Sequence, residues 1–252
     1  MTEIRWYGQS AFKIVTPSGR VLLIDPWLHN PVNTDGAAQE AALDRVDLIL
    51  ITHGHFDHVG SAVALANKHR ARLVSTLDTA MALVAHAGYP ADLVSYETLG
   101  NTGGILPFFE GELEIMITPA YHSSHINPKE AGAGTDDRYH WAGNACGFVV
   151  MPQGGATIYH TGDTDLYAEM TYVGLGGPVD VMLACIGDHF TMGPERAAEA
   201  TKLVDPRVVV PMHFGTFLPM MTGTPPKFKA ALEARGLGDR YRELSVNEPA
   251  EF

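Results

Sequence analysis

The chain has 252 residues, of which 46% are hydrophobic, and this is enough apolar material to bury a sizeable core. Its formal net charge of −12 disfavours nucleic-acid binding through a large basic face. No apolar run approaches the length of a membrane span, and Met1 to Trp6 lack the basic-then-apolar order of a signal peptide. We therefore expect one globular domain over residues 1–252, located in the cytoplasm, with no membrane partner and with nucleic acid as an unfavoured one.

Strand-like and helix-like segments alternate along the whole chain. The first half predicts strands at Ile4 to Trp6, Ala11 to Val15, Val21 to Asp25, Leu48 to Ile51 and Leu73 to Thr76, and helices at Val59 to His69 and Thr79 to Ala87. The second half predicts strands at Glu114 to Thr118, Cys146 to Met151, Thr157 to His160, Val179 to Ile186 and Val208 to Pro211, and helices at Asp165 to Tyr172, Pro194 to Val204 and Pro226 to Ala234. This alternation favours an α/β fold, and a two-sheet sandwich flanked by helices satisfies it.

Three histidines and an aspartate follow the strand that ends at Ile51, in an H-x-H-x-D-H motif formed by His53, His55, Asp57 and His58. Imidazole nitrogens and carboxylate oxygens are ligands that zinc and its neighbours prefer. After a strand end, the first two histidines can point to one side of the turn and the last two residues to the other. Any one of these residues alone would be interpreted as a surface or core residue, but together they predict a metal site, and a double one.

Other apolar runs also end in a candidate ligand or its partner, namely Asp25, His122, Asp163 and His213. In α/β folds such residues converge, because the carboxyl ends of strands gather at one rim of the sheet. The segment after Thr118 offers two histidines, and we choose His122 because it follows the strand sooner. His125 is then a group on the substrate side or in solvent. Two long segments, Pro26 to Ala42 and Ile126 to Gly143, are predicted to be functional loops.

The order of these motifs resembles the metallo-β-lactamase superfamily. More narrowly, four segments are similar to the metal-dependent hydrolases related to the ascorbate-6-phosphate lactonases: I-T-H-G-H-F-D-H at 51–58, A-Y-H-S-S at 120–124, H-T-G-D-T at 160–164 and I-G-D-H-F-T-M-G-P at 186–194. The resemblance runs from Ile4 to Phe228. It implies an αββα sandwich, in which two mixed β-sheets are flanked by helices.

The resemblance also implies a centre of two divalent metal ions per chain. The first ion would be held by His53, His55 and His122, and the second by Asp57, His58 and His213, with Asp163 bridging the two. Asp25 would hydrogen-bond the motif loop without touching metal; on spacing alone, a turn aspartate before Pro26 is the alternative. Zinc is the first expectation, and manganese, iron and cobalt suit the same ligands.

The expected chemistry is hydrolysis by a metal-bridging hydroxide, because two divalent ions about 3.5 to 4 Å apart lower the pKa of a shared water. The candidate catalytic residues are Asp57, Asp163 and His189. His189 is a proton donor or an anion contact, because it follows another strand end. Two alternatives remain for His140: it faces the mouth of the pocket, or it stacks on Trp141. The resemblance favours a small, anionic ester, lactone or phosphodiester as substrate.

Two other functions remain as alternatives. A nuclease or phosphodiesterase acting on RNA is disfavoured by the acidic composition. A non-hydrolytic di-iron redox protein is disfavoured by His55, because that branch of the superfamily carries glutamate there. Some relatives assemble into homo-oligomers, so self-association is a further expectation. Cys146 and Cys185 lie in apolar runs and are predicted to be core thiols.

Overall fold

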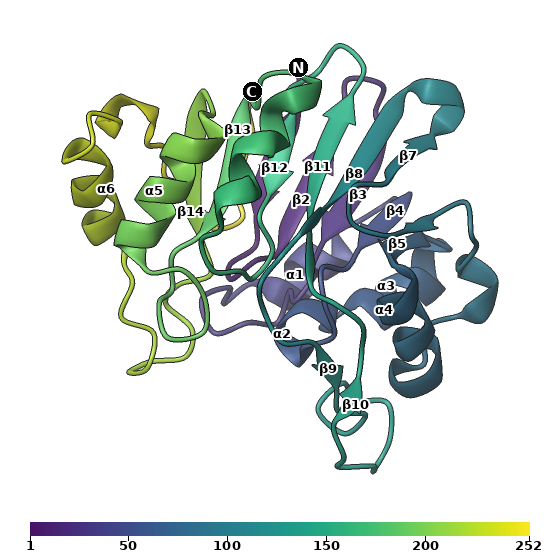
Figure 1. Ribbon diagram of the computed structural model, residues 1–252. Coiled ribbons are helices and arrows are strands. Elements are labelled where there is room, and N and C mark those ends of the chain that lie inside the picture. The colour runs from purple at the N-terminus through teal and green to yellow at the C-terminus, as the bar shows by residue number, and fades with distance from the viewer.

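The computed structural model describes residues 1–252, and its strands form two sheets that face each other, with helices on the outer sides (Figure 1). The first sheet has seven strands in the order β15-β1-β2-β3-β4-β5-β6. Their bounds are β1 (Glu3–Trp6), β2 (Phe12–Val15), β3 (Val21–Ile24), β4 (Leu48–Leu50), β5 (Arg72–Thr76), β6 (Leu99–Gly100) and β15 (Pro249–Glu251). Pairing is antiparallel from β15 to β3 and parallel from β3 to β6.

The second sheet has six strands in the order β14-β13-β12-β11-β8-β7. Their bounds are β7 (Ile105–Phe108), β8 (Leu113–Pro119), β11 (Cys146–Pro152), β12 (Ile158–His160), β13 (Val181–Cys185) and β14 (Val208–Met212). Strands β12, β13 and β14 are parallel, and the other pairs are antiparallel. Both sheets are therefore mixed, and the predicted αββα sandwich is confirmed.

Helices cover the outer face of each sheet. On the first sheet lie α3 (Ala62–His69) and α4 (Leu77–Ala82), the latter continued by a π-helical turn, η1 (Leu83–Ala87). On the second lie α5 (Pro194–Val204), α6 (Pro225–Glu233) and the 3-10 helix η4 (Ala168–Gly176). The remaining short elements are α1 (Gly36–Ala41), α2 (Phe56–Val59), η2 (Ala91–Leu93), η3 (Phe109–Gly111), η5 (Gly238–Arg240) and a hairpin of β9 (His125–Ile126) and β10 (His140–Trp141).

The apolar core has two parts, which follow from the alternation of side chains along the strands. In β3, Leu22 and Ile24 belong to a cluster of 42 buried residues that joins the two sheets and reaches α5 and α6. Leu23, between them, belongs to a second cluster of 23 residues under α3 and α4. Because β3 is buried on both faces, its sequence is a continuous apolar run.

Two helix predictions were wrong in detail. The helix expected over Val59 to His69 is divided into α2 and α3, because Gly60 takes a φ of +33° and ends the first turn. The helix expected over Asp165 to Tyr172 is instead η4, which starts at Ala168 because Tyr167 is extended. The strands β6, β7, β9, β10 and β15 were not predicted, because β6, β9 and β10 hold two residues each and β7 and β15 each contain a proline, which in sequence indicates a break.

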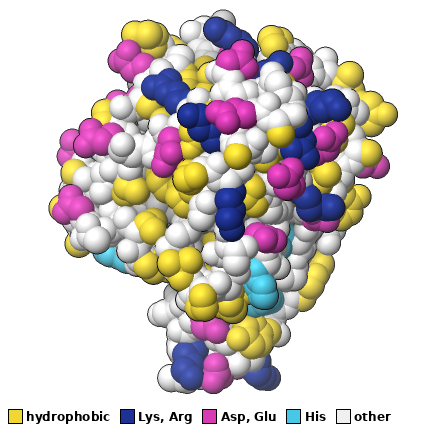
Figure 2. Space-filling model, turned by 90° about the vertical axis from the view of Figure 1, so that its left-hand side faces the viewer, with side chains coloured by type: hydrophobic (Ala, Val, Ile, Leu, Met, Phe, Trp, Pro, Cys, Tyr) yellow, Lys and Arg dark blue, Asp and Glu magenta, His cyan; other side chains and the backbone are white.

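The two ends of the molecule differ in what they carry. Both chain termini lie at the upper end in Figure 1, where β1 and β15 pair, whereas α2 and the β9–β10 hairpin lie at the lower end. On the face shown in Figure 2, basic and acidic side chains are interspersed rather than gathered by sign. None of the helices combines the length and the apolar character that a membrane span needs.

Candidate metal centre

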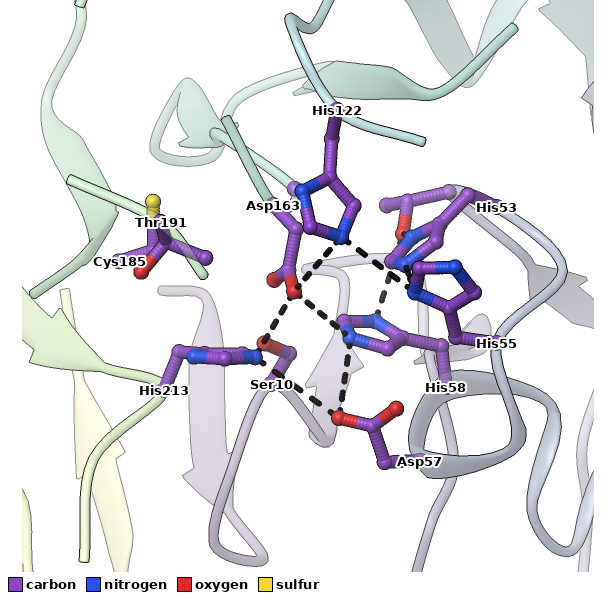
Figure 3. A network of polar contacts seen from close by, with 12 residues as sticks. Ser10, His53, His55, Asp57, His58, His122, Asp163, Cys185, Thr191 and His213 are labelled. Carbon is purple, nitrogen blue, oxygen red and sulfur yellow. Dashed lines mark hydrogen bonds and ion pairs between the residues drawn. The ribbon is translucent and has the colours of Figure 1, made fainter. Parts of the chain in front are cut away.

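The candidate ligands lie at the lower end of the molecule, where strands of both sheets stop. His53 follows β4, Asp57 and His58 lie in α2, His122 follows β8, Asp163 follows β12 and His213 follows β14. Figure 3 shows these side chains pointing toward one another from both sheets. The convergence arises because the carboxyl ends of these strands share one rim of the sandwich.

Three groups of side chains each bring their nitrogen and oxygen atoms within 4.8 Å of one another. They are His53 with His55 and His122, His53 with His58 and Asp163, and Asp57 with His58 and His213. The carboxylate of Asp163 lies between the first and last groups (Figure 3), since its Oδ2 is 2.8 Å from Nε2 of His213 and 3.8 Å from Nε2 of His122. The arrangement therefore offers overlapping groups of donor atoms that could hold a metal ion.

The three histidines of the first group are held neutral. Burial lowers the pKa of His53 well below its usual value and lowers that of His55 to about 3. Burial also lowers the pKa of His122. A neutral imidazole keeps a free lone pair, which is what a metal ion requires of it.

The other side chains of the cluster bring two buried carboxylates, Asp57 and Asp163, beside two histidines, His58 and His213. Burial opposes protonation of His58 and His213, yet the carboxylate of Asp163 and its neighbours raise the pKa of His58 well above its usual value and that of His213 to about 9. Burial opposes ionisation of Asp163, yet His213 and His58 lower its pKa well below the usual range. These buried carboxylates need positive charge beside them, and without metal the protons of the two histidines supply it.

Two orphaned atoms support a fit to metal. Nε2 of His58 and Oδ1 of Asp163 are buried and have no hydrogen-bond partner. Buried polar atoms are rarely left unpaired, so these two atoms call for a ligand. A donor set of imidazole nitrogens and carboxylate oxygens suits zinc and other divalent transition metals.

Asp25 directly follows β3 and is fully buried. Its carboxylate accepts hydrogen bonds from the backbone N of Thr52 at 2.8 Å and from the Thr52 hydroxyl at 2.6 Å. Its Oδ2 also lies 2.7 Å from Nδ1 of His58. This contact turns Nε2 of His58 toward the cluster, so the geometry gives Asp25 the hydrogen bonds that an orienting role needs.

Gln9 is a buried contact of the cluster that the sequence did not reveal. Its Nε2 donates to Oδ2 of Asp57 at 2.9 Å, and its Oε1 accepts from the hydroxyl of Thr216 at 2.6 Å. The residue lies between β1 and β2 with a φ of +49°. No local pattern marks a single glutamine in a turn, because its partners Asp57 and Thr216 are distant in sequence.

The structure separates the two histidines after β8. Nε2 of His122 lies 3.3 Å from Nδ1 of His55, on the side that also meets His53. His125 lies on the other side, with its Nδ1 3.1 Å from Nε2 of His55. The packing is tight, since a Cβ on Gly54 would lie 2.8 Å from the backbone oxygen of His125.

The remaining histidines do not join the cluster. His189 is exposed and packs edge-on against Phe190, so the predicted catalytic residue lies outside the group of ligands. His140 stacks on His86 at 3.9 Å, rather than on Trp141. His160 is buried, with Nε2 3.0 Å from the backbone oxygen of Ser10.

A cavity of about 390 Å³ opens over the cluster. Its lining consists of His55, Phe56, Asp57, His122, Ser123, His125, Glu130, Tyr139, Asp163, Phe190, His213, Phe217 and Met220. The volume suits a small molecule. Glu130 and Tyr139 come from the long segment after β9, as expected of a functional loop. The lining contains no lysine or arginine, so outside the metal cluster no cationic side chain is present to bind the anionic substrate favoured by the resemblance.

Comparison with known proteins places this site in a family. Residues 3–213 match the model of the β-lactamase superfamily domain. The chain belongs to this superfamily and, within it, to the UPF0173 metal-dependent hydrolases. The relative from Thermodesulfovibrio yellowstonii that bears this family name is 47% identical and is aligned over 98% of this chain and 91% of its own length.

Solved structures agree with the assignment. The metallo hydrolase Igni18 from Ignicoccus hospitalis is 32% identical, with a TM-score of 0.82 over 100% of this chain and 99% of its own. An isothiocyanate hydrolase from gut bacteria of Delia radicum has a TM-score of 0.70 at 19% identity, over 99% of this chain and 98% of its own. The second likeness shows a shared fold, and the first, with the family, shows a metal-dependent hydrolase.

Proposed function

We propose that this hydrolase holds two divalent ions, zinc in the first instance, at the convergence of its two sheets. One ion would be bound by His53, His55 and His122, and the other by Asp57, His58 and His213, with Asp163 shared between them. The observation that carries the proposal is the set of three donor groups within 4.8 Å that these side chains form. Their burial and the orphaned atoms of His58 and Asp163 support it.

Ions bound by these residues would supply Lewis-acid chemistry, lowering the pKa of water and polarising the carbonyl or phosphoryl oxygen of a substrate. The side chains of the protein fix the ligands in place. Asp25 orients His58 from behind, and Gln9 holds the carboxylate of Asp57. Asp57 and Asp163 line the pocket, so their carboxylates would hold the ions next to a bound substrate. They are therefore the catalytic carboxylates of the proposal.

The predicted role of His189 in catalysis stays a prediction. Its side chain is exposed and does not line the pocket, whereas that of the next residue, Phe190, does. The cytoplasmic location and self-association also stay predictions. Of the alternatives, RNA cleavage gains no support, because no lysine or arginine lines the pocket to bind a phosphate backbone.

The test is hydrolysis of a panel of lactones, esters, thioesters and phosphodiesters by the purified protein, before and after chelation. We expect chelator-sensitive turnover that returns when zinc or manganese is added back. His55→Ala should abolish turnover and lower bound metal with the fold preserved, while His189→Ala tests the predicted proton donor and should leave the bound metal unchanged. Full activity of a metal-depleted His55→Ala protein would refute the mechanism.

A further inference from the structure

Three phenylalanine rings form one side of the pocket, and we call Phe56, Phe190 and Phe217 the aromatic wall. The ring of Phe217 meets Phe56 at a centroid distance of 6.1 Å and Phe190 at 6.4 Å, both edge-on. Phe56 is 38% exposed and Phe190 is 42% exposed. Three adjacent, partly exposed rings beside a cavity form a contiguous apolar surface, and such a surface marks a binding site more often than a single exposed ring does.

The aromatic wall is held from behind. The indole of Trp27 stacks on Phe217 at 6.0 Å with an interplanar angle of 10°, and it meets the edge of Phe56 at 5.7 Å. The four rings come from four separate segments of the chain, which follow β3, β4, β13 and β14. A solvated surface gives no reason for four segments to converge in this way. The wall is therefore preformed beside the metal cluster.

The charge of the pocket outside the metal cluster disfavours an anionic group on the part of the substrate that lies there. Beyond the metal cluster, the only charged side chain in the lining is Glu130, whose Oε1 accepts a hydrogen bond from the Tyr139 hydroxyl at 3.1 Å. A carboxylate or phosphate placed away from the cluster would meet this glutamate and no counter-charge. Taking an ionic group out of water without a partner is costly, whereas burying an apolar group is favourable.

We propose that the substrate is a small carboxylic ester or lactone whose apolar ring or chain packs against the aromatic wall while its carbonyl faces the cluster. The inference rests on the proposed hydrolase and deepens it by assigning the substrate class. Hydrolysis of such a substrate breaks the acyl C–O bond; water supplies a hydroxyl to the acyl carbon and a proton to the leaving oxygen. No redox partner is needed.

Binding of product-like acids to the zinc-loaded protein tests the inference without turnover. Isothermal titration should compare butyrate, 4-phenylbutyrate and succinate. Each offers one carboxylate to the cluster, and they differ in what would face the wall. We expect 4-phenylbutyrate to bind at least about tenfold more tightly than butyrate. Succinate should bind no more tightly than butyrate. Equal binding of all three, tighter binding of succinate, or no binding of any would overturn the inference.

Variants test whether the aromatic wall causes the preference for 4-phenylbutyrate over butyrate. Phe217→Ala and Phe190→Ala should each reduce the ratio of the two affinities, with circular dichroism confirming the fold. Tyr96→Ala, at a ring that is 85% exposed and outside the pocket, is the matched control and should keep the ratio. An unchanged ratio in both wall variants would overturn the inference.

Measurements of turnover distinguish a failure of this inference from a failure of the proposed function on which it rests. We expect γ-phenyl-γ-butyrolactone to show a higher kcat/KM than γ-butyrolactone. Hydrolysis of both at equal kcat/KM would overturn the inference that an apolar group of the substrate packs on the aromatic wall, and would leave the hydrolase standing. Protein that takes up no metal would instead contradict the proposed function itself.

Discussion

The carboxylate of Asp163 is the point at which the two halves of the site meet. It is buried, it lies 2.8 Å from His213 and 3.3 Å from His58, and one of its oxygens has no hydrogen-bond partner. A group so placed must either keep protonated histidines beside it or bind cations. Removing it would leave the raised pKa of His213 without its main cause, as well as removing the shared ligand.

Gln9 is predicted to position Asp57. Gln9→Ala removes the 2.9 Å hydrogen bond to Oδ2 of Asp57, so we expect metal affinity to fall by about 10- to 100-fold at one of the two ions. Competition with a coloured chelator measures this. Gln153→Ala, at an exposed glutamine, is the matched control. If both variants bind metal like the parent protein, Gln9 has no positioning role.

The two histidines after β8 should behave differently. His122→Ala removes a proposed ligand, and we expect it to lower the metal content by about one ion per chain. His125→Ala removes only the contact at 3.1 Å to the far nitrogen of His55, so both ions should remain with weaker binding. Elemental analysis of the two variants distinguishes the roles. The reverse result would show that the ligand after β8 was chosen wrongly.

At the scale of the elements, the central strands that lead to the site are buried in the core. Cys146 in β11 and Cys185 in β13 illustrate this, because both thiols are fully buried and free. Burial raises the pKa of Cys146 far above its usual value and that of Cys185 to about 11. Only the thiolate reacts, and at pH 8 almost none is present.

We therefore expect neither cysteine to react with Ellman's reagent in the native protein at pH 8 over minutes, and two thiols per chain to react once urea unfolds it. Absorbance of the released thiolate measures both. Rapid labelling of one thiol before unfolding would show that its strand is accessible.

Strands with strong apolar runs, and the side chains that cluster at their ends, were predictable from sequence. In β3 and β4 the runs stand out because each strand is buried on both faces; Asp25 follows β3 directly, and His53 follows β4 after two residues. Gln9 was not predictable, because its contact with Asp57 bridges 48 positions and depends on a turn with positive φ. The aromatic wall was missed for the same reason, since Trp27 and Phe217 meet only when two loops converge.

Some short strands could not be predicted, because their sequences show no clear alternation of apolar and polar residues. β7 contains Pro107, which in sequence reads as a break, yet it pairs with β8 at the edge of the second sheet. The predicted proton donor, His189, follows the end of a strand, as the residues of the metal cluster do. Sequence could not show that its φ of +57° leaves it exposed while Phe190 lines the pocket.

At the scale of the whole molecule, one cluster of 42 buried residues joins both sheets. The first and last strands also pair, with Glu3 opposite Glu251. We therefore expect the metal-free chain to unfold as one unit, in agreement with a single domain over residues 1–252. Circular dichroism and tryptophan fluorescence in a urea titration should give coincident transitions. Two separated transitions would show that the sheets are independent.

The central claim is that this fold brings together a site for two ions, and metal content per chain tests it most directly. Protein purified without chelator should carry close to two equivalents of divalent metal by elemental analysis, and Asp163→Ala should carry fewer while keeping its circular dichroism spectrum. A chain that carries no metal, and takes up none from zinc or manganese solution, would contradict the account.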